Sequence, residues 1–523
     1  MRRFLRFPFV WRTIAVAGAT CAFGLPVSLQ ASPPVGDETV QVSIDDMTQT
    51  ASSVETTEGV VVSSATGDGG ACGVCGECGG KAACSCEDFK RLRKSVAKSH
   101  NVLFYKNKFD YLCDPCYDEW WPGDYFKRNA IGNWGVLDIG GQYRARFHDE
   151  VNMRGLGLTG RDDRFLLHRT RLYANLEVGR RVRVFAEYLD AVSNYENFNP
   201  RPIEESRSNI QNLFADLLLW DGDHGTVTGR VGRQELLYAQ QRLVSPLDWA
   251  NTRRTFEGVS VLWKGQNWDI DGFWTNPVPP AGDDFLDTDR SQEFSGVWAT
   301  YKALKNETVD LFYLRYIETD NAGFEYNTIG GAYRGNQGRF LWDFWGAYQW
   351  GNVGAFDQEA LAWTVGLGWK FECQPWTPTV WAYYDWAEGD PNGNGFHHMF
   401  PLAHKWNGWM DLFGRRNLED LNFMATLTPA EKWKFIAWWH VFWLQDGNDV
   451  PYSVVMTPYV ATAGGSQYLG QELDLLLNWN FNPRMSVLLG YSYFWAGSFY
   501  TTNPNALYAD DANFTYVQFT FNF

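Results

Sequence analysis

The sequence has no long uninterrupted hydrophobic run beyond its first thirty residues. A membrane-spanning helix needs about 20 consecutive, predominantly apolar residues, and no interior stretch approaches that length. The chain also has no excess of basic charge, since its formal net charge is −16. Such a chain repels phosphate backbones, so we expect no nucleic-acid partner. These absences exclude a helical membrane protein and a nucleic-acid-binding protein.

Catalytic motifs are also missing. The sequence contains no nucleophile elbow and no phosphate-binding loop. Its Ser, His and Asp residues form no set that can be distinguished from chance. We therefore expect no enzyme activity and no cofactor.

Aromatic residues, in contrast, are abundant: they make up 17% of the chain and include 26 Trp. Aromatic side chains gather at the headgroup level of membranes, because the ring is apolar and its tip is polar. A membrane protein without spanning helices must be a closed β-barrel, because lipid satisfies no backbone hydrogen bonds. The composition therefore predicts an all-β fold, a transmembrane antiparallel β-barrel surrounded by the lipid of the cell outer membrane.

The N-terminal part of the chain divides into three segments. Four arginines precede a short apolar run at 13–27, and small residues follow near Ala31. This pattern predicts a signal peptide over 1–31. Residues 32–70 show no sustained period and predict a flexible linker. Residues 71–130 form a cysteine-rich segment with a short basic helix, which we expect in the periplasm, where it has the opportunity to bind periplasmic partners.

From residue 131 to residue 523, segments of about ten residues alternate in hydrophobicity, which is the pattern of outer-membrane barrels. Eighteen candidate strands follow one another. They span 136–148, 164–178, 181–190, 209–220, 225–237, 256–264, 267–275, 292–303, 307–318, 323–335, 338–350, 359–371, 376–387, 418–428, 431–445, 468–480, 484–496 and 511–523.

The expected connections between these strands alternate in length. Tight turns such as 179–180 and 221–224 alternate with mostly longer loops, of which 388–417 is the longest. Two connections, near 319–322 and 351–358, break the trend by being shorter. Outer-membrane barrels place tight turns in the periplasm and long loops outside the cell. We therefore expect the long loops to project outward.

Arginines alternate with apolar residues in the first strands. In the stretch QYRARFH (142–148), Tyr143, Ala145 and Phe147 share one face and Arg144 and Arg146 share the other. A charge on the lipid face near the midplane costs about 2 to 4 kcal/mol. The arginines are therefore expected to face a wet lumen.

The same alternation predicts a set of pore-lining or substrate-binding arginines. Arg315 enters the set because Phe312, Leu314 and Tyr316 are assigned to lipid, and the two arginines at 253 and 254 are expected at the lip. Guanidinium groups hold carboxylates through two hydrogen bonds, which suits anionic ligands. Two interpretations stay open for each arginine: contact with a ligand, or a structural ion pair with an acid such as Glu187. The set is Arg144, Arg146, Arg169, Arg171, Arg183, Arg230, Arg253, Arg254 and Arg315.

Several aromatic residues of the later strands fall on the polar face. They are Trp345, Trp381, Tyr383 and Trp438. On a channel wall such rings stack against sugars. A register error of one residue would instead place them in the lipid girdle. We favour the girdle.

The cysteines of the N-terminal segment have C-x2-C spacings that suit zinc or an iron–sulfur cluster. Disulfides are favoured over metal, because the periplasm is oxidising. The segment holds an odd number of cysteines, and Cys373, in a turn expected on the same side, completes the pairs. His397, His398 and His404 share one loop, and we interpret them as ordinary loop residues without a metal. The disulfide candidates are Cys72, Cys75, Cys78, Cys84, Cys86, Cys113, Cys116 and Cys373.

Two stretches resemble the bacterial alginate-export family of outer-membrane barrels. They are GRVGRQELLYAQQRLVSPLDWANTRRTFEGV (229–259) and FHHMFPLAHKWNGWMDLFGRRNLEDLNF (396–423). The resemblance covers about 130–523 and implies an eighteen-stranded barrel with an arginine-lined pore for a polyuronate. The cysteine-rich segment departs from the family's best-known members and resembles barrel proteins of planctomycete-type bacteria.

Together these observations predict an outer-membrane channel for an anionic substrate. The expected substrate is an acidic polysaccharide, alginate-like, or its fragments, and small anions are the simpler case. Two alternatives remain: a general or sugar-uptake porin, and a structural envelope barrel that anchors the cysteine-rich segment.

Overall fold

The computed structural model describes residues 86–155, 157–280, 282, 287–320 and 323–523. The predicted signal peptide and linker lie outside the described residues. So do Cys72, Cys75, Cys78 and Cys84, and the side chain of Cys86 is not described.

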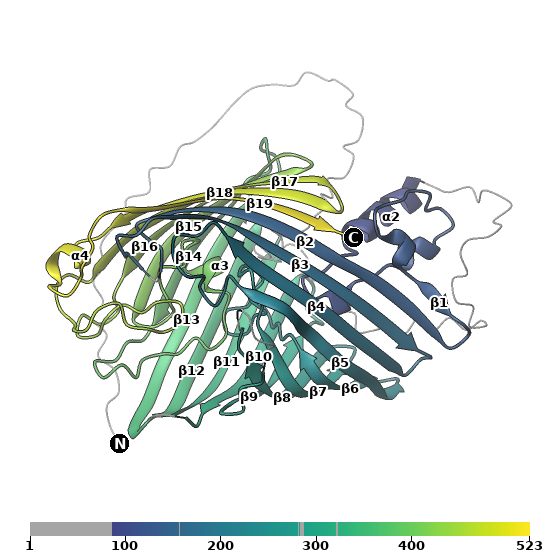
Figure 1. Ribbon diagram of the computed structural model, residues 1–523, viewed down its shortest axis with the longest axis horizontal. Helices are drawn as coiled ribbons and strands as arrows, with labels where there is room; N and C mark the ends of the chain where they lie inside the picture. Colours follow the sequence, from purple (N-terminus) through teal and green to yellow (C-terminus); the bar gives the residue numbers. More distant parts are fainter. Residues whose placement is uncertain (1–85, 156, 281, 283–286, 321–322) are drawn as a thin grey trace. The chain divides into compact units, whose positions relative to one another are not determined.

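Strands β2 to β19 pair in sequence order, each antiparallel to the next, and β19 pairs with β2. The result is a closed barrel of 18 strands, which confirms the predicted fold class (Figure 1). The strands are β2 Gly135–Val151, β3 Asp163–Val178, β4 Val182–Asn194, β5 Ser206–Gly222, β6 Gly225–Gln234, β7 Thr255–Lys264, β8 Trp268–Val278, β9 Gln292–Tyr301, β10 Glu307–Glu318, β11 Phe324–Gln337, β12 Phe340–Val353, β13 Phe356–Lys370, β14 Thr379–Ala387, β15 Leu418–Ala430, β16 Trp433–Trp443, β17 Tyr468–Asn482, β18 Met485–Ala496 and β19 Ala512–Asn522.

The residues before the barrel form short elements. They are α2 Cys86–Ala97, three 3-10 turns (η1 Phe104–Lys106, η2 Asp110–Cys113 and η3 Asp124–Phe126) and β1 Asn129–Ile131, which pairs only with β2. Two further short helices, α3 Ala403–Trp406 and α4 Phe499–Thr502, lie in loops. Within the described ranges, no helix has the length and apolar character needed to span a membrane.

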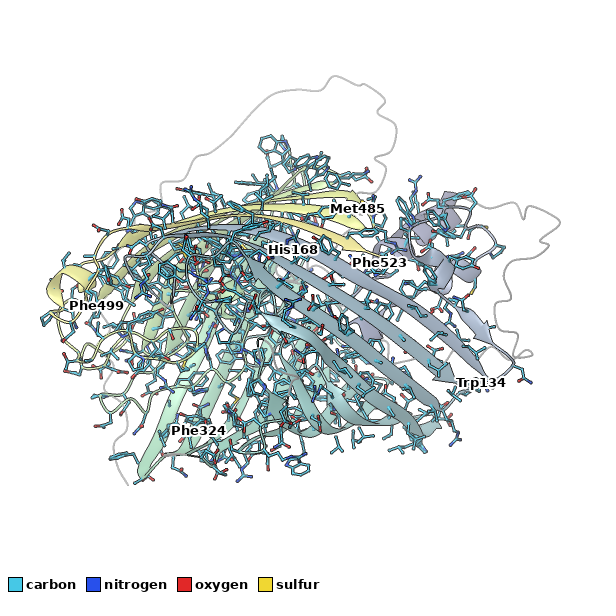
Figure 2. The ribbon with its side chains drawn as sticks, viewed as in Figure 1. Trp134, His168, Phe324, Met485, Phe499 and Phe523 are labelled. Atoms are coloured by element: carbon cyan, nitrogen blue, oxygen red, sulfur yellow. The ribbon has the colours of Figure 1, made fainter. Side chains whose placement is uncertain are left out.

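The two ends of the barrel differ in their connections. At one end, here called the turn end, tight turns join β3 to β4, β5 to β6 and so on around the barrel. At the other, the loop end, the connections are mostly long, although β12 and β13 are joined by residues 354–355 alone. Trp134, Met485 and Phe523 lie toward the turn end, and Phe324 and Phe499 toward the loop end (Figure 2).

Side chains alternate between an outer and an inner face along each strand, as extended backbone requires. On β2, Phe147 is exposed on the outer face, whereas Arg144 and Arg146 are buried on the inner face. The outer face as a whole is apolar, with Leu172, Val231 and Leu311 among its exposed residues. This is the arrangement that lipid on the outside demands.

Two of the long connections fold into the barrel, contrary to the expectation that long loops project outward. They are the 235–254 loop and the 388–417 loop. Arg242 of the first loop pairs with Asp343 of β12 at 3.0 Å and with Asp385 of β14 at 3.2 Å. In the second loop, the Met410 amide donates to Glu472 of β17 at 2.8 Å. Figure 1 shows α3, which belongs to the second loop, within the ring of strands.

The inserted loops also bind each other. Trp406 Nε1 donates to the Gln240 carbonyl at 2.8 Å, and the Phe400 amide donates to the Leu243 carbonyl at 2.9 Å. The ring of Trp249 stacks on His404 with a centroid separation of 3.6 Å. Buried aromatic and aliphatic residues of both loops form the apolar cores inside the barrel.

These loops explain why the predicted position of the later aromatics is wrong. Trp345, Trp381, Tyr383 and Trp438 are all buried on the inner face and do not lie in a lipid girdle. Phe396 of the 388–417 loop packs against Trp345, and Trp406 packs against Tyr383 and Trp438. Because the loop brings apolar side chains inside, aromatic residues are stable on the inner face there.

Candidate functional site

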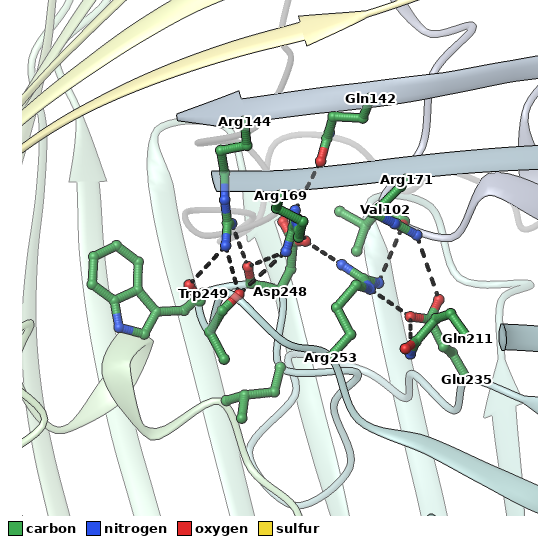
Figure 3. Close-up of polar contacts among 12 residues, drawn as sticks. Val102, Gln142, Arg144, Arg169, Arg171, Gln211, Glu235, Asp248, Trp249 and Arg253 are labelled. Atoms are coloured by element: carbon green, nitrogen blue, oxygen red, sulfur yellow. Dashed lines mark hydrogen bonds and ion pairs between the residues drawn. The ribbon is translucent and has the colours of Figure 1, made fainter. Parts of the chain in front are cut away.

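The inner face of β2 to β6, together with the 235–254 loop that lies against it, carries a concentration of arginines, here called the arginine cluster. Each of its arginines is held by a carboxylate or a backbone carbonyl, and Figure 3 shows Arg144, Arg169, Arg171 and Arg253 among them. The cluster consists of Arg144, Arg146, Arg169, Arg171, Arg183, Arg230 and Arg253, together with the carboxylates of Glu187, Asp216, Glu235 and Asp248.

The arginines of β2 bind the backbone of the 235–254 loop. Arg144 donates from Nη1 to the Asp248 carbonyl at 2.7 Å and from Nη2 to the Ala250 carbonyl at 2.6 Å. Arg146 donates to the Trp249 carbonyl at 2.7 Å, and its guanidinium lies 3.9 Å from the centre of the Trp249 ring. Both side chains face the interior as predicted, but the loop covers them, so the expectation that they face a wet lumen is wrong in this conformation.

The arginines of β3 pair with carboxylates. Arg169 Nη2 lies 2.8 Å from Asp248 Oδ1 and donates to Gln142 Oε1 at 2.8 Å. Arg171 Nε donates to Glu187 Oε1 at 2.6 Å. Pairing of this kind offsets the cost of burying a guanidinium.

Asp216 of β5 joins two further arginines nearer the turn end. It accepts from Arg230 Nε at 2.7 Å and from Arg183 Nε at 3.0 Å. Arg230 also lies 3.9 Å from the centre of the Phe214 ring. Cation–π contact of this kind stabilises a guanidinium away from water.

Arg253 and Arg254 lie within the inserted loop and not at the lip where they were expected. Arg253 donates to Glu235 Oε1 at 2.5 Å and also pairs with Asp248. Arg254 donates to the carbonyls of Ser245 and Pro401, which tie it to both inserted loops and place it outside the cluster.

Arg315 is the one arginine of the predicted set that the structure places on the opposite face. It shares the outer face of β10 with Leu311 and Tyr313, and pairs with Glu293 and Glu325 near the loop end. The inner face of β10 carries Phe312, Leu314 and Tyr316, which pack in the core that includes Phe400. The assignment is wrong because the inserted loops reverse the usual rule that apolar residues face lipid.

Neighbouring guanidinium groups keep the carboxylate of Asp248, in the 235–254 loop, charged. Burial raises the pKa of Asp248, but the guanidinium groups of Arg169 and Arg253 outweigh burial and hold the pKa well below its usual value. Asp248 therefore remains a carboxylate and keeps its ion pairs at neutral pH.

The cluster retains binding capacity that protein groups do not use. Its seven arginines exceed its four carboxylates by three charges. Three buried N–H groups have no hydrogen-bond partner in the described part of the chain: Arg144 Nε, Arg146 Nε and Arg169 Nε. Arg171 Nη2 makes no hydrogen bond either, but it lies 3.9 Å from Glu235 Oε2. A buried donor left unpaired costs about 1 to 3 kcal/mol. An anionic oxygen is the natural complement to this arrangement.

Several buried or half-buried arginines were not singled out in the sequence, because they lie in connections where strand alternation gives no signal. Arg154 pairs with Asp163 and Glu204, and Arg201 pairs with Glu150. Arg242 and Arg415 both pair with Asp385.

The expected link between Cys373 and the N-terminal segment is wrong. Cys373 is a free, exposed thiol in the turn between β13 and β14, where Arg339 Nη2 lies 3.4 Å from its Sγ. Cys113 and Cys116 are disulfide-bonded. The N-terminal segment packs against Tyr173, Phe185 and Phe214, on strands well removed from that turn in the barrel.

The described residues contain no group of three or more His, Cys, Asp and Glu side chains arranged to hold a metal ion. His398 and His404 are buried in the 388–417 loop, His397 is half-buried there, and their contacts are with protein. His398 Nε2 lies 3.1 Å from the Val454 carbonyl, and His404 Nδ1 lies 3.2 Å from Asp411.

Comparison with known proteins adds a family match. A family model described as alginate export matches residues 136–512. Among curated proteins, none matches the chain significantly.

Solved structures show the same fold at low sequence identity. The crystal structure of Pseudomonas aeruginosa OpdO superposes with a TM-score of 0.51 at 13% identity, covering 74% of this chain and 97% of that one. Acinetobacter baumannii OccAB1 gives 0.51 at 12%, covering 74% and 96%. Pseudomonas aeruginosa OccK8 (OprE) gives 0.51 at 11%, covering 74% and 98%.

Proposed function

The chain belongs to the alginate-export family of outer-membrane barrels, and from that premise we propose that this channel passes an acidic polysaccharide or its fragments along the arginine cluster. The observation that carries the proposal is the composition of the cluster: an excess of three positive charges together with the buried Nε–H groups of Arg144, Arg146 and Arg169, which have no hydrogen-bond partner among the described residues. Carboxylates of a polyuronate match both features.

Transport in this proposal is passive. Positive potential in a low-dielectric interior attracts the anion, and binding at several weak sites allows it to leave again. The carbonyls of the 235–254 loop occupy Arg144 and Arg146 in the structure. A moving carboxylate therefore replaces loop carbonyls at these arginines, so the loop shifts during passage.

The test compares two sets of arginines in planar lipid bilayers. Replacing Arg144, Arg146, Arg169 and Arg171 by Gln removes four charges and keeps hydrogen-bonding capacity. The reversal potential in a salt gradient should move toward cation selectivity. Block by oligouronates should weaken by roughly tenfold or more, because a hydrogen bond to a charged group contributes about 1.5 to 3 kcal/mol.

Arg315→Gln is the matched control, because Arg315 lies on the outer face and its loss leaves the interior unchanged. If the fourfold variant does not assemble, the pair Arg144→Gln and Arg146→Gln carries the test, because these two arginines bind carbonyls and not carboxylates. Unchanged selectivity and unchanged block in a folded variant would show that the cluster only braces the wall. A barrel that conducts no ions, even after the segments that fill its interior have been loosened by mutation, would favour the structural-anchor alternative.

A further inference from the structure

Residues 99–111, which precede the barrel in the sequence, reach into it from the turn end. We call them the plug. Phe104 and Tyr105 of η1 are buried against Tyr173 of β3, Phe185 of β4 and Phe214 of β5. All three partners point inward from the barrel wall. The plug therefore occupies interior space beside β3 to β5.

The plug touches four members of the arginine cluster. The guanidinium of Arg171 lies 3.7 Å from the centre of the Phe104 ring, and that of Arg230 lies 4.4 Å from the centre of the Tyr105 ring. Arg183 Nη1 donates to the Tyr105 carbonyl at 2.8 Å. Arg253 Nη2 donates to the Val102 carbonyl at 3.2 Å (Figure 3).

These contacts use the groups that an anion would use. Carbonyl oxygens of the plug accept from Arg183 and Arg253, and aromatic faces cover Arg171 and Arg230. A carboxylate of a ligand needs the same N–H donors and the same space. The plug and an anionic ligand therefore exclude each other at these four arginines.

The plug also meets the inserted loop that enters from the other end. Tyr105 OH donates to the Glu235 carbonyl at 2.9 Å, and Glu235 pairs with Arg253 of the same loop. The arginine cluster is thus covered by the 235–254 loop toward one end and by the plug toward the turn end.

A separate contact holds the plug at the turn end. Arg484, in the turn between β17 and β18, donates from Nη1 to Ser99 Oγ at 2.7 Å and also pairs with Tyr111 OH. The same guanidinium lies 3.0 Å from Asp124, just beyond the plug. Arg484 lies outside the arginine cluster. We call its contacts with Ser99 and Tyr111 the latch.

We propose that residues 99–111 are an autoinhibitory plug that closes the turn end of the arginine cluster, and that the plug leaves when the channel conducts. The proposal rests on the proposed function only in that the barrel is a channel. It does not depend on which anion passes.

The first test weakens the plug in the full-length chain. Phe104→Ala combined with Tyr105→Ala removes both buried rings, and Arg484→Gln removes the latch without altering the cluster. Each variant should show a higher single-channel conductance and fewer closed intervals than the unaltered protein in planar bilayers. Trp120→Ala is the control, because Trp120 lies in the same N-terminal segment and is 67% exposed. Conductance equal to that of the unaltered protein in both plug variants would overturn the proposal.

The second test compares a single variant with its plug cross-linked to the barrel and with its plug free. Ser99→Cys and Arg484→Cys, in a Cys373→Ser background, place two thiols at the latch. A short bis-maleimide bridge should lower the conductance, and the unbridged protein should conduct more. Equal conductance with and without the bridge would also refute the plug.

These outcomes separate the two proposals. If loosening the plug raises conductance but the Gln variants of Arg144, Arg146, Arg169 and Arg171 keep their selectivity, the plug stands and the anionic substrate fails. If selectivity depends on those arginines but conductance is the same with and without the plug mutations, the anionic substrate stands and the plug fails.

Discussion

The carboxylate of Asp248 lies 2.8 Å from the guanidinium of Arg169, and the two residues are on different parts of the barrel. Arg169 belongs to the wall strand β3, whereas Asp248 belongs to the loop that folds inward. Arg253 of that loop contacts the same carboxylate. This three-residue contact fastens the 235–254 loop over the arginine cluster.

Replacing Asp248 by Asn should loosen that loop. The change leaves two buried guanidinium groups with one fewer counter-charge, and breaking a buried ion pair costs about 3 kcal/mol or more. Limited proteolysis should cut the 235–254 loop faster in Asp248→Asn. The reversal potential should also move toward anion selectivity, opposite to the arginine variants. Asp223→Asn, in an exposed turn, is the control for loss of one negative charge, and equal effects of the two changes would refute the fastening role.

Attachment of the N-terminal segment should strengthen as the pH rises from 8 to 9.5. Burial lowers the pKa of Lys127 from 10.5 to about 8. The negative charge of Asp138 raises this pKa in part, and the positive charge of Arg484 lowers it further. Released Lys127 keeps its proton up to about pH 10. Between pH 8 and 9.5 the released form therefore binds more protons, and raising the pH favours the attached form. Below pH 8 both forms are protonated, and this dependence disappears.

Hydrogen exchange of the residues around Lys127, measured at matched intrinsic rates, checks this dependence. Burial raises the pKa of Tyr105 to about 12, whereas a released tyrosine titrates near 10, so tyrosines oppose the trend only above the chosen window. Lys127→Met should remove the dependence. Protection that falls with pH in the unaltered protein would contradict the assignment.

Cys373 should react with a maleimide in the folded, non-reduced protein. It is exposed and free, whereas Cys113 and Cys116 are disulfide-bonded. Peptide mapping should therefore find the label on Cys373 and find it on Cys113 and Cys116 only after reduction. A Cys373 peptide that stays unlabelled until reduction would restore the pairing that the structure contradicts.

Neighbouring tryptophans of β16 should differ sharply in their contribution to stability. Trp438 is 2% exposed on the inner face and donates to Asn422 Oδ1 at 2.8 Å, whereas Trp439 is 38% exposed on the outer face. Trp438→Ala should lower the free energy of unfolding by about 3 to 5 kcal/mol, as for other buried aromatic truncations. Trp439→Ala should cost less, because its ring has fewer protein neighbours. Urea-induced unfolding in lipid vesicles measures both, and a larger loss for Trp439 would reverse the assigned faces.

Local alternation was sufficient to predict the barrel, because lipid imposes one rule on every strand. All eighteen predicted segments correspond to β2–β19, and Arg144 and Arg146 lie on the inner face. The same rule failed for Arg315. For Trp438 alternation alone gave the inner face, and the preference for a lipid girdle was wrong. At these places Phe400 and Trp406 of the 388–417 loop fill the interior. The sequence of a strand alone does not indicate which residues of a distant loop will pack against it.

The contacts of the candidate site were harder to predict than its members. The arginines themselves were visible as residues opposite apolar neighbours. Their partners were not, because Asp248 lies in a connection and Val102 lies in a segment before the barrel. Whether an arginine is open or covered depends on such long-range contacts, and these have no period in the sequence.

The closing pair of strands sets an order for assembly. β19 must travel back to β2, the first strand of the barrel, and such distant pairing forms slowly because loop closure costs entropy before contacts repay it. The N-terminal residues find several partners in these last-formed elements: Lys127 donates to the Phe523 carbonyl at 3.1 Å, and Ser99 accepts from Arg484. Those partners exist in place only after the final hairpin has been added. The contacts of Lys127 and Ser99 therefore require a closed ring, whereas the contacts of Phe104 and Tyr105 with β3 to β5 do not.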